Sequence, residues 1–248
     1  LSALDEIAWT LNVRCSDVEF NPVTISYAYL SDTVNVFFVD ERKIDADVRA
    51  YLKECGVEVA PYDSVEKFLE KIKDATVLLD PNKTSDTIAR SLLNCGTVYA
   101  QSPVALLKAV KNDVQIEGTR KAMERDGVAL VKLFMWIEQN VASGSITEYD
   151  VVQKVQEFRA ASPLYRGESF GLIAGYNEHG AIVHYEPEKE TASTLHPEGM
   201  LLVDTGGQYL DGTTDITRTV ALGTPTEAQR HDYTLVLKGH IALGSMIY

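Results

Sequence analysis

The chain has 248 residues, of which 45% are hydrophobic and 24% are charged, the composition of a globular protein with one large or two modest domains. Its formal net charge of -13 argues against nucleic acid or an anionic membrane surface as a partner, because both would repel it. No apolar run approaches the ~20 residues needed to cross a bilayer, and no signal-peptide pattern opens the chain.

The cysteines Cys15, Cys55 and Cys95 match no zinc or disulfide spacing. We therefore expect buried free thiols in a reducing compartment, which favours a cytoplasmic protein. The first residue is Leu1 rather than methionine, and the helical pattern over 235–248 has no stop signal of its own. These ends predict that the chain is part of a longer polypeptide.

Helix and strand signals alternate over the first hundred residues. The expected helices begin at the capping residues Ser2, Asp45 and Asp63, and a further helix covers 85–94. The expected strands cover 22–30, 34–39, 57–60 and 75–79, with a last one from Thr97. This alternation predicts a mixed-sheet α/β domain over residues 1–105. The polar loop 14–22, which contains Asp17, is expected to serve as a turn.

The second domain is expected to cover residues 106–248, with Ser102-Pro103 at the boundary. A long helix is predicted from Asn112 to about Val141, and Gly127 interrupts it at a cost of about 1 kcal/mol relative to alanine. We therefore expect a tertiary reason for Gly127. Thr147 and Asp150 cap the helix that follows.

Strand signals begin at Phe170. Two apolar runs, 171–175 and 181–185, are separated by a turn, and His184 lies in the second run. A single histidine in an apolar strand is usually a core residue. Further on, Thr224-Pro-Thr-Glu227 predicts a helix capped by Thr224. Its apolar face would consist of Tyr233, Val236, Leu237 and Ile241.

The most informative stretch runs from Leu201 to Thr219. An apolar run delivers Asp204, turn signals at Gly206-Gly207 and Asp211-Gly212 follow, and Asp215 opens a second β-branched run. This order predicts a folded-back ribbon in which the two aspartates face one another. Two close carboxylates repel unless a proton or a cation lies between them, and oxygen donors on strands suit a divalent ion. On spacing alone an alternative stays open: Asp204 ends a strand, and Asp215 pairs with Arg218 or caps a turn.

The chain resembles the aminopeptidase P (Xaa-Pro aminopeptidase) branch of the pita-bread metallopeptidases. The residues that carry this resemblance are Asp211-Gly-Thr-Thr-Asp-Ile-Thr-Arg-Thr219, Gly223-Thr-Pro-Thr226, Tyr233-Thr-Leu-Val-Leu-Lys-Gly-His240 and Leu4-Asp-Glu-Ile-Ala-Trp9. Cys15 departs from the glycine usual there. The resemblance implies a fold of class α/β (α+β): a creatinase N-terminal-like domain, then the N-terminal half of a pita-bread catalytic domain.

That resemblance also implies a site. Asp204 and Asp215 match two of five ligands to two divalent ions, most often manganese, although zinc or cobalt also fit. The other ligands, a histidine and two glutamates, lie further along the family's chains, beyond Tyr248. His184 matches a histidine that binds substrate beside the metals, and Thr217 is a candidate to hold a ligand carboxylate. The implied reaction removes the N-terminal residue from Xaa-Pro peptides through a water that bridges the two ions.

The resemblance further implies a homodimer for the full-length protein, with no nucleic-acid or membrane partner. Without the later ligands, the 248 residues alone are expected to bind metal weakly and to be inactive. Two other function classes stay open: a prolidase or creatinase type of hydrolase, and a non-catalytic pita-bread module that binds partners. The match over 211–219 favours aminopeptidase P over the first, and the presence of both aspartates argues against the second.

Overall fold

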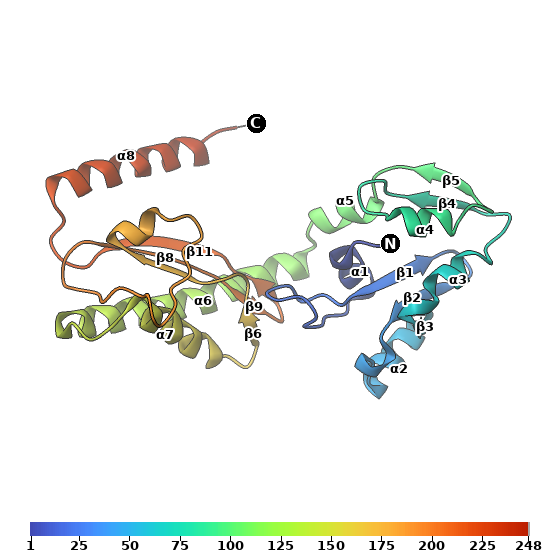
Figure 1. The fold of residues 1–248 in the computed structure, drawn as a ribbon, viewed down its shortest axis with the longest axis horizontal. Coiled ribbons are helices and arrows are strands. Elements are labelled where there is room, and N and C mark those ends of the chain that lie inside the picture. The colour runs from blue at the N-terminus through green and yellow to red at the C-terminus, as the bar shows by residue number, and fades with distance from the viewer. Residues whose placement is uncertain (248) are drawn as a thin grey trace. The chain divides into compact units, whose positions relative to one another are not determined.

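The structure is a computed structural model that describes residues 1–247, and it divides into two compact units, Leu1–Asp113 and Val114–Tyr248. Helices and strands occur in both units, which confirms the α/β (α+β) class (Figure 1). None of the described helices combines the length and apolar content needed to cross a membrane.

The first unit contains two small sheets and short helices. Strands β1, β2 and β3 form one sheet in that order, with β1 antiparallel and β3 parallel to β2, and β4 pairs with β5 in parallel. Its elements are α1 (Leu4–Leu11), β1 (Ser26–Leu30), β2 (Asn35–Val39), η1 (Glu41–Lys43), α2 (Ala46–Glu54), β3 (Val57–Pro61), η2 (Tyr62–Ser64), α3 (Val65–Leu69), β4 (Thr76–Leu79), α4 (Asp86–Arg90), β5 (Gly96–Tyr99) and α5 (Pro103–Ala109).

Strand β2 is buried on both faces. Phe37 and Val39 belong to one apolar cluster with residues of α1 and α2, whereas Val36 and Phe38 belong to another with residues of α3 and α4. Successive side chains of a strand point to opposite faces, so one strand supplies both layers. The predicted mixed-sheet α/β organisation of this part is confirmed.

Several local predictions in this unit are wrong. Ser2 does not cap α1, where Ala3 holds the capping position without a side-chain bond. The helix expected from Asp63 begins as a short 3-10 turn, because Ser64 Oγ donates to the Pro61 carbonyl instead of capping α3. The helix expected over 85–94 ends at Arg90, and the Ser85 side chain caps its start by accepting a hydrogen bond from the Ile88 amide. The cysteines are free, but none is buried as expected: Cys55 is exposed, and Cys15 and Cys95 are half-buried.

Asp17 explains why β1 starts late. Its carboxylate accepts hydrogen bonds from Thr24 Oγ1 (2.9 Å), the Ile25 amide (2.8 Å) and Lys43 Nζ (2.5 Å). Thr24 and Ile25 therefore bond to the Asp17 side chain ahead of the strand. The strand expected from residue 22 accordingly begins only at Ser26. Burial opposes ionisation of Asp17, but the bonds from Lys43, Ile25 and Thr24 outweigh it and lower the pKa of Asp17 to about 2.

The second unit places two helices against antiparallel strands. Strands β11, β8 and β7 form one sheet in that order, and β10, β9 and β6 form another. Its elements are α6 (Asp113–Asn140), η3 (Val141–Ser143), α7 (Glu148–Ala160), β6 (Tyr165–Glu168), β7 (Ile173–Tyr176), η4 (Asn177–Ala181), β8 (Met200–Thr205), β9 (Gly207–Tyr209), β10 (Gly212–Thr213), β11 (Ile216–Ala221) and α8 (Glu227–Gly244).

One core joins α6 and α7 to the β11–β8–β7 sheet. Leu133 of α6, Val151 of α7 and Leu201 and Val203 of β8 all belong to it. Burial alternates along β8, so Leu201, Val203 and Thr205 are buried while Leu202 and Asp204 are only partly buried. The predicted capping box of α7, formed by Thr147 and Asp150, is confirmed.

The long helix α6 is confirmed, but the expected reason for Gly127 is wrong. A Cβ at Gly127 would meet nothing within 4 Å. The glycine that matters is Gly118, where a Cβ would lie 2.3 Å from the Asp211 carbonyl oxygen. Arg125 of the same helix also binds Asp211 through two hydrogen bonds, of 3.0 and 2.9 Å. The turn before β10 is therefore seated directly on α6.

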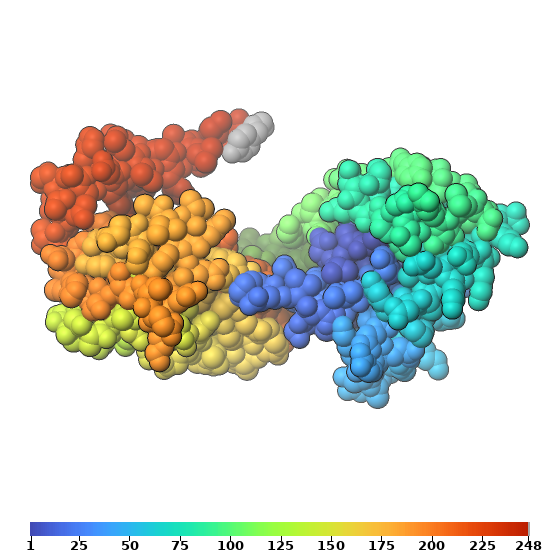
Figure 2. All heavy atoms as spheres, in the orientation of Figure 1, coloured from blue at the N-terminus to red at the C-terminus, as the bar shows by residue number. Residues whose placement is uncertain are grey.

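Helix α8 lies on the outside of its unit (Figure 2). Thr226, rather than the predicted Thr224, caps it, because Thr226 and Gln229 form a reciprocal capping box. The predicted apolar face is not packed, since Val236 is 74% and Ile241 57% exposed. None of the described residues of α8 is buried.

We predict that Asp17→Asn removes part of the decrease in the free energy of unfolding that the wild-type protein shows as the pH falls below about 4. A carboxyl whose pKa falls from 3.8 to about 2 on folding contributes stability above pH 3.8, and loses that stability as the pH falls towards 2. The variant should lose about 1 kcal/mol near neutral pH, the scale of a partly solvated ion pair, and much less at pH 2. Urea unfolding at both pH values measures this, and an equal loss at both would contradict it.

Candidate metal centre

Strand β8 carries Asp204, and Asp215 directly precedes β11 on the same face of the ribbon. The two strands pair antiparallel, with Thr217 opposite Asp204 and Ile216 opposite Thr205. Asp215 lies two positions before Thr217, just outside β11. Like Thr217, it is exposed, whereas Thr214 and Ile216 are buried, so Asp215 and Thr217 lie on the same side of the chain. Diagonal neighbours of this kind lie about 7–8 Å apart at the backbone, within reach of one shared site. The predicted folded-back ribbon is confirmed.

The two carboxylates differ in their surroundings. Thr217 Oγ1 donates a 2.7 Å hydrogen bond to Asp204 Oδ1, as expected for a residue that holds this carboxylate. Asp215 is exposed and forms no ion pair with any residue that the structure describes. Arg218 instead donates to the Thr217 carbonyl. The alternative in which Asp215 pairs with Arg218 is therefore wrong.

Gly206 allows the two strand ends to approach. A Cβ at this position would lie 2.1 Å from the Thr214 carbonyl oxygen, 2.2 Å from Ser169 Oγ and 2.8 Å from the Phe170 ring. Ser169 Oγ also donates to that Thr214 carbonyl, at 2.8 Å. A Cβ here would therefore clash with the backbone of the opposing segment as well as with two side chains, so glycine at this position allows the two segments to approach.

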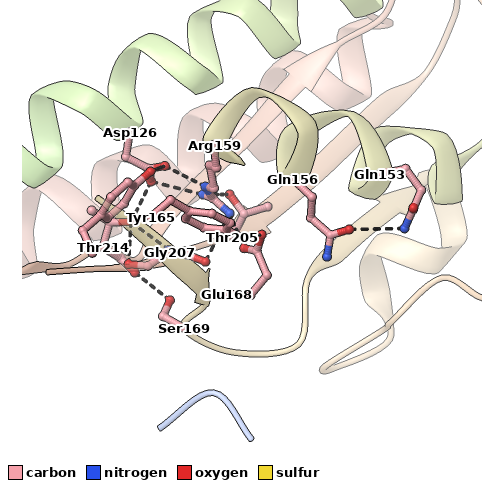
Figure 3. A network of polar contacts seen from close by, with 12 residues as sticks. Asp126, Gln153, Gln156, Arg159, Tyr165, Glu168, Ser169, Thr205, Gly207 and Thr214 are labelled. Carbon is pink, nitrogen blue, oxygen red and sulfur yellow. Dashed lines mark hydrogen bonds and ion pairs between the residues drawn. The ribbon is translucent and has the colours of Figure 1, made fainter. Parts of the chain in front are cut away.

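A buried ionic network lies beneath this ribbon (Figure 3). Arg159 of α7 contacts Asp126 of α6 at 2.6 Å and Glu168 of β6 at 2.5 Å, and the side chains of Arg159 and Asp126 are fully buried. Desolvation opposes the charge on Arg159, but Asp126 and Glu168 outweigh it and raise its pKa. Burial raises the pKa of Glu168 against the opposing charge of Arg159, and burial together with Glu168 raises the pKa of Tyr165.

His184 does not lie where the sequence predicted. The run 181–185 is not a strand, and His184 is an exposed residue with φ 57° in the left-handed region. Asn177, with φ 50°, also leaves the extended conformation, so β7 ends at Tyr176 and the short 3-10 helix η4 follows. Within the described residues, His184 makes no hydrogen bond and does not join the two aspartates in a cluster of metal type.

The residue that organises this segment is Glu148, which sequence reasoning missed. Its fully buried carboxylate accepts hydrogen bonds from the amides of Tyr176 (2.6 Å) and Ser193 (2.7 Å) and from the Tyr185 hydroxyl (2.9 Å). His179 Nδ1 lies 3.0 Å from both carboxylate oxygens. Glu148 therefore ties the residues on both sides of His184 to the first turn of α7.

The donor set fits part of a divalent metal site. Asp204 and Asp215 offer carboxylate oxygens on one face, and Thr217 orients one of them. Over residues 1–247, however, no group of three or more His, Cys, Asp or Glu side chains could hold an ion. The ribbon can supply two ligands, and the rest of a coordination shell must come from elsewhere.

The chain belongs to metallopeptidase family M24, whose sequence model matches residues 117–247. The Creatinase/Prolidase N-terminal domain matches residues 1–115. The resemblance to the aminopeptidase P branch is confirmed by its relatives.

These relatives are similar over the whole chain. A probable Xaa-Pro aminopeptidase P of Arthroderma benhamiae is 42% identical over 100% of this chain and 37% of its own length. Aminopeptidase P2 of Arabidopsis thaliana is 35% identical over 100% of this chain and 39% of its own length. The chain thus spans about two fifths of these relatives.

A solved structure shows the same arrangement. X-prolyl aminopeptidase of Caenorhabditis elegans, described as a cytosolic enzyme with a di-nuclear active site, superimposes with a TM-score of 0.88. It is 32% identical, and the match covers 96% of this chain and 40% of that one. The pita-bread architecture expected from the sequence is thereby confirmed.

We predict that Gly206→Ala disrupts the ribbon. A methyl group 2.1 Å from a carbonyl oxygen must displace the backbone of β8 or of the segment before β11, at a cost of about 2–3 kcal/mol. Urea unfolding measures this loss. Gly127→Ala is the matched control, because its methyl meets no atom and should stabilise α6 by about 0.5–1 kcal/mol. Equal effects of the two substitutions would contradict the prediction.

We predict that Glu148→Gln loosens the segment around His184. One oxygen of the Glu148 carboxylate would become an NH₂ group, which cannot accept a hydrogen bond from the buried amides that now donate to it. The variant should therefore lose about 2 kcal/mol or more of its free energy of unfolding. Hydrogen exchange at Tyr176 and Ser193 should quicken. Glu157→Gln in the same helix is the control: its side chain is 65% exposed, so it should change stability by less than about 0.5 kcal/mol.

Proposed function

We propose that these 248 residues form part of a longer Xaa-Pro aminopeptidase, which removes the N-terminal residue from peptides with proline in second position. The observation that carries this proposal is the placement of Asp204 and Asp215 on one face of the β8–β11 ribbon, where Asp215 is exposed and forms no ion pair within residues 1–247. The names of the relatives, which match across the whole chain, support the substrate class.

The proposed cofactor is a pair of divalent ions, with manganese favoured by the oxygen donors and zinc or cobalt as alternatives. When bound, such ions lower the pKa of a shared water, so that hydroxide is available near neutral pH. In this chain, Asp204 would bind one ion and Asp215 both. Thr217 would keep Asp204 Oδ1 oriented through the hydrogen bond that the structure contains.

His184 would bind the substrate carbonyl and its developing negative charge in the full-length enzyme. Its exposure supports this role, because a histidine sealed in the core could not reach a peptide. The hydrogen bonds of Glu148 to Tyr185 and Tyr176 would hold the backbone on either side of it.

This chain alone is proposed to bind metal weakly and to cleave no peptide. Two aspartates cannot fill the shells of two ions, each of which prefers about six donors. We further propose that the full-length protein is a cytoplasmic homodimer that binds Xaa-Pro peptides and no nucleic acid or membrane.

Asp204→Asn and Asp215→Asn should each abolish activity of the full-length protein. Mutation of a residue that is hydrogen-bonded to a metal ligand typically lowers activity by about 10–100-fold. Removal of a ligand itself should have a larger effect, so kcat/KM should fall by more than about 100-fold, and calorimetry should show reduced Mn²⁺ uptake. Asp211→Asn is the control, because Asp211 lies in the same segment but pairs with Arg125. Wild-type activity in both ligand variants would refute the assignment.

The substrate class has its own test. Rates on Xaa-Pro dipeptides and on longer Xaa-Pro peptides should be compared with Mn²⁺ present. An aminopeptidase cleaves the longer peptides, whereas a dipeptidase requires the free carboxylate of a dipeptide. Cleavage of dipeptides alone would replace the proposed substrate class while leaving the metal centre intact.

A further inference from the structure

The Arg159–Asp126 ion pair touches both ends of the ribbon that carries the two aspartates (Figure 3). Arg159 Nη2 donates to Thr205 Oγ1 at 2.8 Å, and Arg159 Nη1 donates to the Gly206 carbonyl at 3.1 Å. On the other side, Thr214 Oγ1 donates to Asp126 Oδ2 at 2.7 Å. One buried pair therefore holds both segments.

The residues it holds are the immediate neighbours of the proposed ligands. Thr205 directly follows Asp204, and Thr214 directly precedes Asp215. Thr205 and Thr214 are 1% exposed and lie on the helix side, so Asp204 and Asp215 project from the opposite side. The ion pair thus lies beneath the proposed metal site without being part of it.

We propose that Arg159 and Asp126 are positioning residues, which set the separation of Asp204 and Asp215 and thereby the affinity for the second metal ion. The proposal rests on the proposed function, because it assumes that the two aspartates bind metal. Its physical basis is the rigidity of the linkage: helix α7 fixes one strand end through Arg159, helix α6 fixes the other through Asp126, and the charges bind the helices together.

A purely structural role for the pair predicts a different result. Buried ion pairs contribute little net stability over apolar replacements, so stability alone gives no reason to join four groups at this place. If the pair only stabilised the core, loss of one hydroxyl contact would lower the melting temperature and leave metal binding unchanged. A positioning role requires metal affinity to change as well.

The test removes single hydroxyl contacts from the full-length protein, since loss of either charge could prevent folding. Thr205→Val removes only the bond from Arg159, and Thr214→Val removes the bond to Asp126 together with one from the Gly207 amide. Thr24→Val is the matched control: Thr24 is also a buried threonine whose hydroxyl donates to an aspartate, Asp17, in the first unit.

Two quantities are measured in each variant: Mn²⁺ affinity by calorimetry, and hydrogen exchange of the metal-free protein at Gly207 and Thr214. We expect Thr205→Val and Thr214→Val to weaken binding of the second ion by about 10–100-fold, the range for outer partners of metal ligands. Exchange at the two amides should become faster, while Thr24→Val changes neither quantity.

Wild-type Mn²⁺ affinity in both threonine variants would overturn the positioning role, whatever their melting temperatures. A different result would refute the proposed function, namely unchanged metal uptake in Asp204→Asn and Asp215→Asn. Loss of uptake in the aspartate variants together with wild-type uptake in the threonine variants would retain the metal centre and reject the role of Arg159 and Asp126.

Discussion

The second unit depends on a guanidinium group kept in a dry interior. Arg159 cannot lose its proton, so burying it requires acceptors for its N–H groups. Asp126, Glu168, Thr205 and the Gly206 carbonyl supply them from a helix and two strands. Because the acceptors come from α6, from β6 and from the end of β8, satisfying one charge on α7 fixes the relative places of all four elements. The outer face of the sheet can then present charged groups without distortion.

The sequence predicted what depends on local pattern. The ribbon between Asp204 and Asp215 was predictable because its turn signals and β-branched runs leave few alternatives, and the capping box of α7 lies within four consecutive residues. Side-chain alternation placed Thr217 on the face of Asp215 as a candidate to hold a ligand carboxylate, and the structure shows that it binds Asp204. Family resemblance then supplied the chemical meaning that spacing left open.

What could not be predicted depends on contacts between distant residues. Arg159 and Asp126 lie 33 positions apart, and their neighbours in sequence give no sign that both are buried. Glu148 looked like an ordinary first-turn acid of a helix, yet its partners lie 28 to 45 positions further on. The Tyr185 hydroxyl binds the same carboxylate as the Tyr176 amide at the end of β7, and His184 between them has a positive φ, so the apolar run 181–185 forms a turn and not a strand.

The closed surroundings of Gly206 also bear on how this protein can vary. Every other amino acid carries a Cβ, and at this position that atom has no room beside the Thr214 carbonyl and Ser169. A random library made across β8 and selected for folding should therefore recover glycine alone at 206. The outward-facing site of Leu202, by contrast, should accept many residues. Tolerance of substitution would thus alternate between outward-facing and buried positions of β8, and would be lowest at Gly206, directly after the strand.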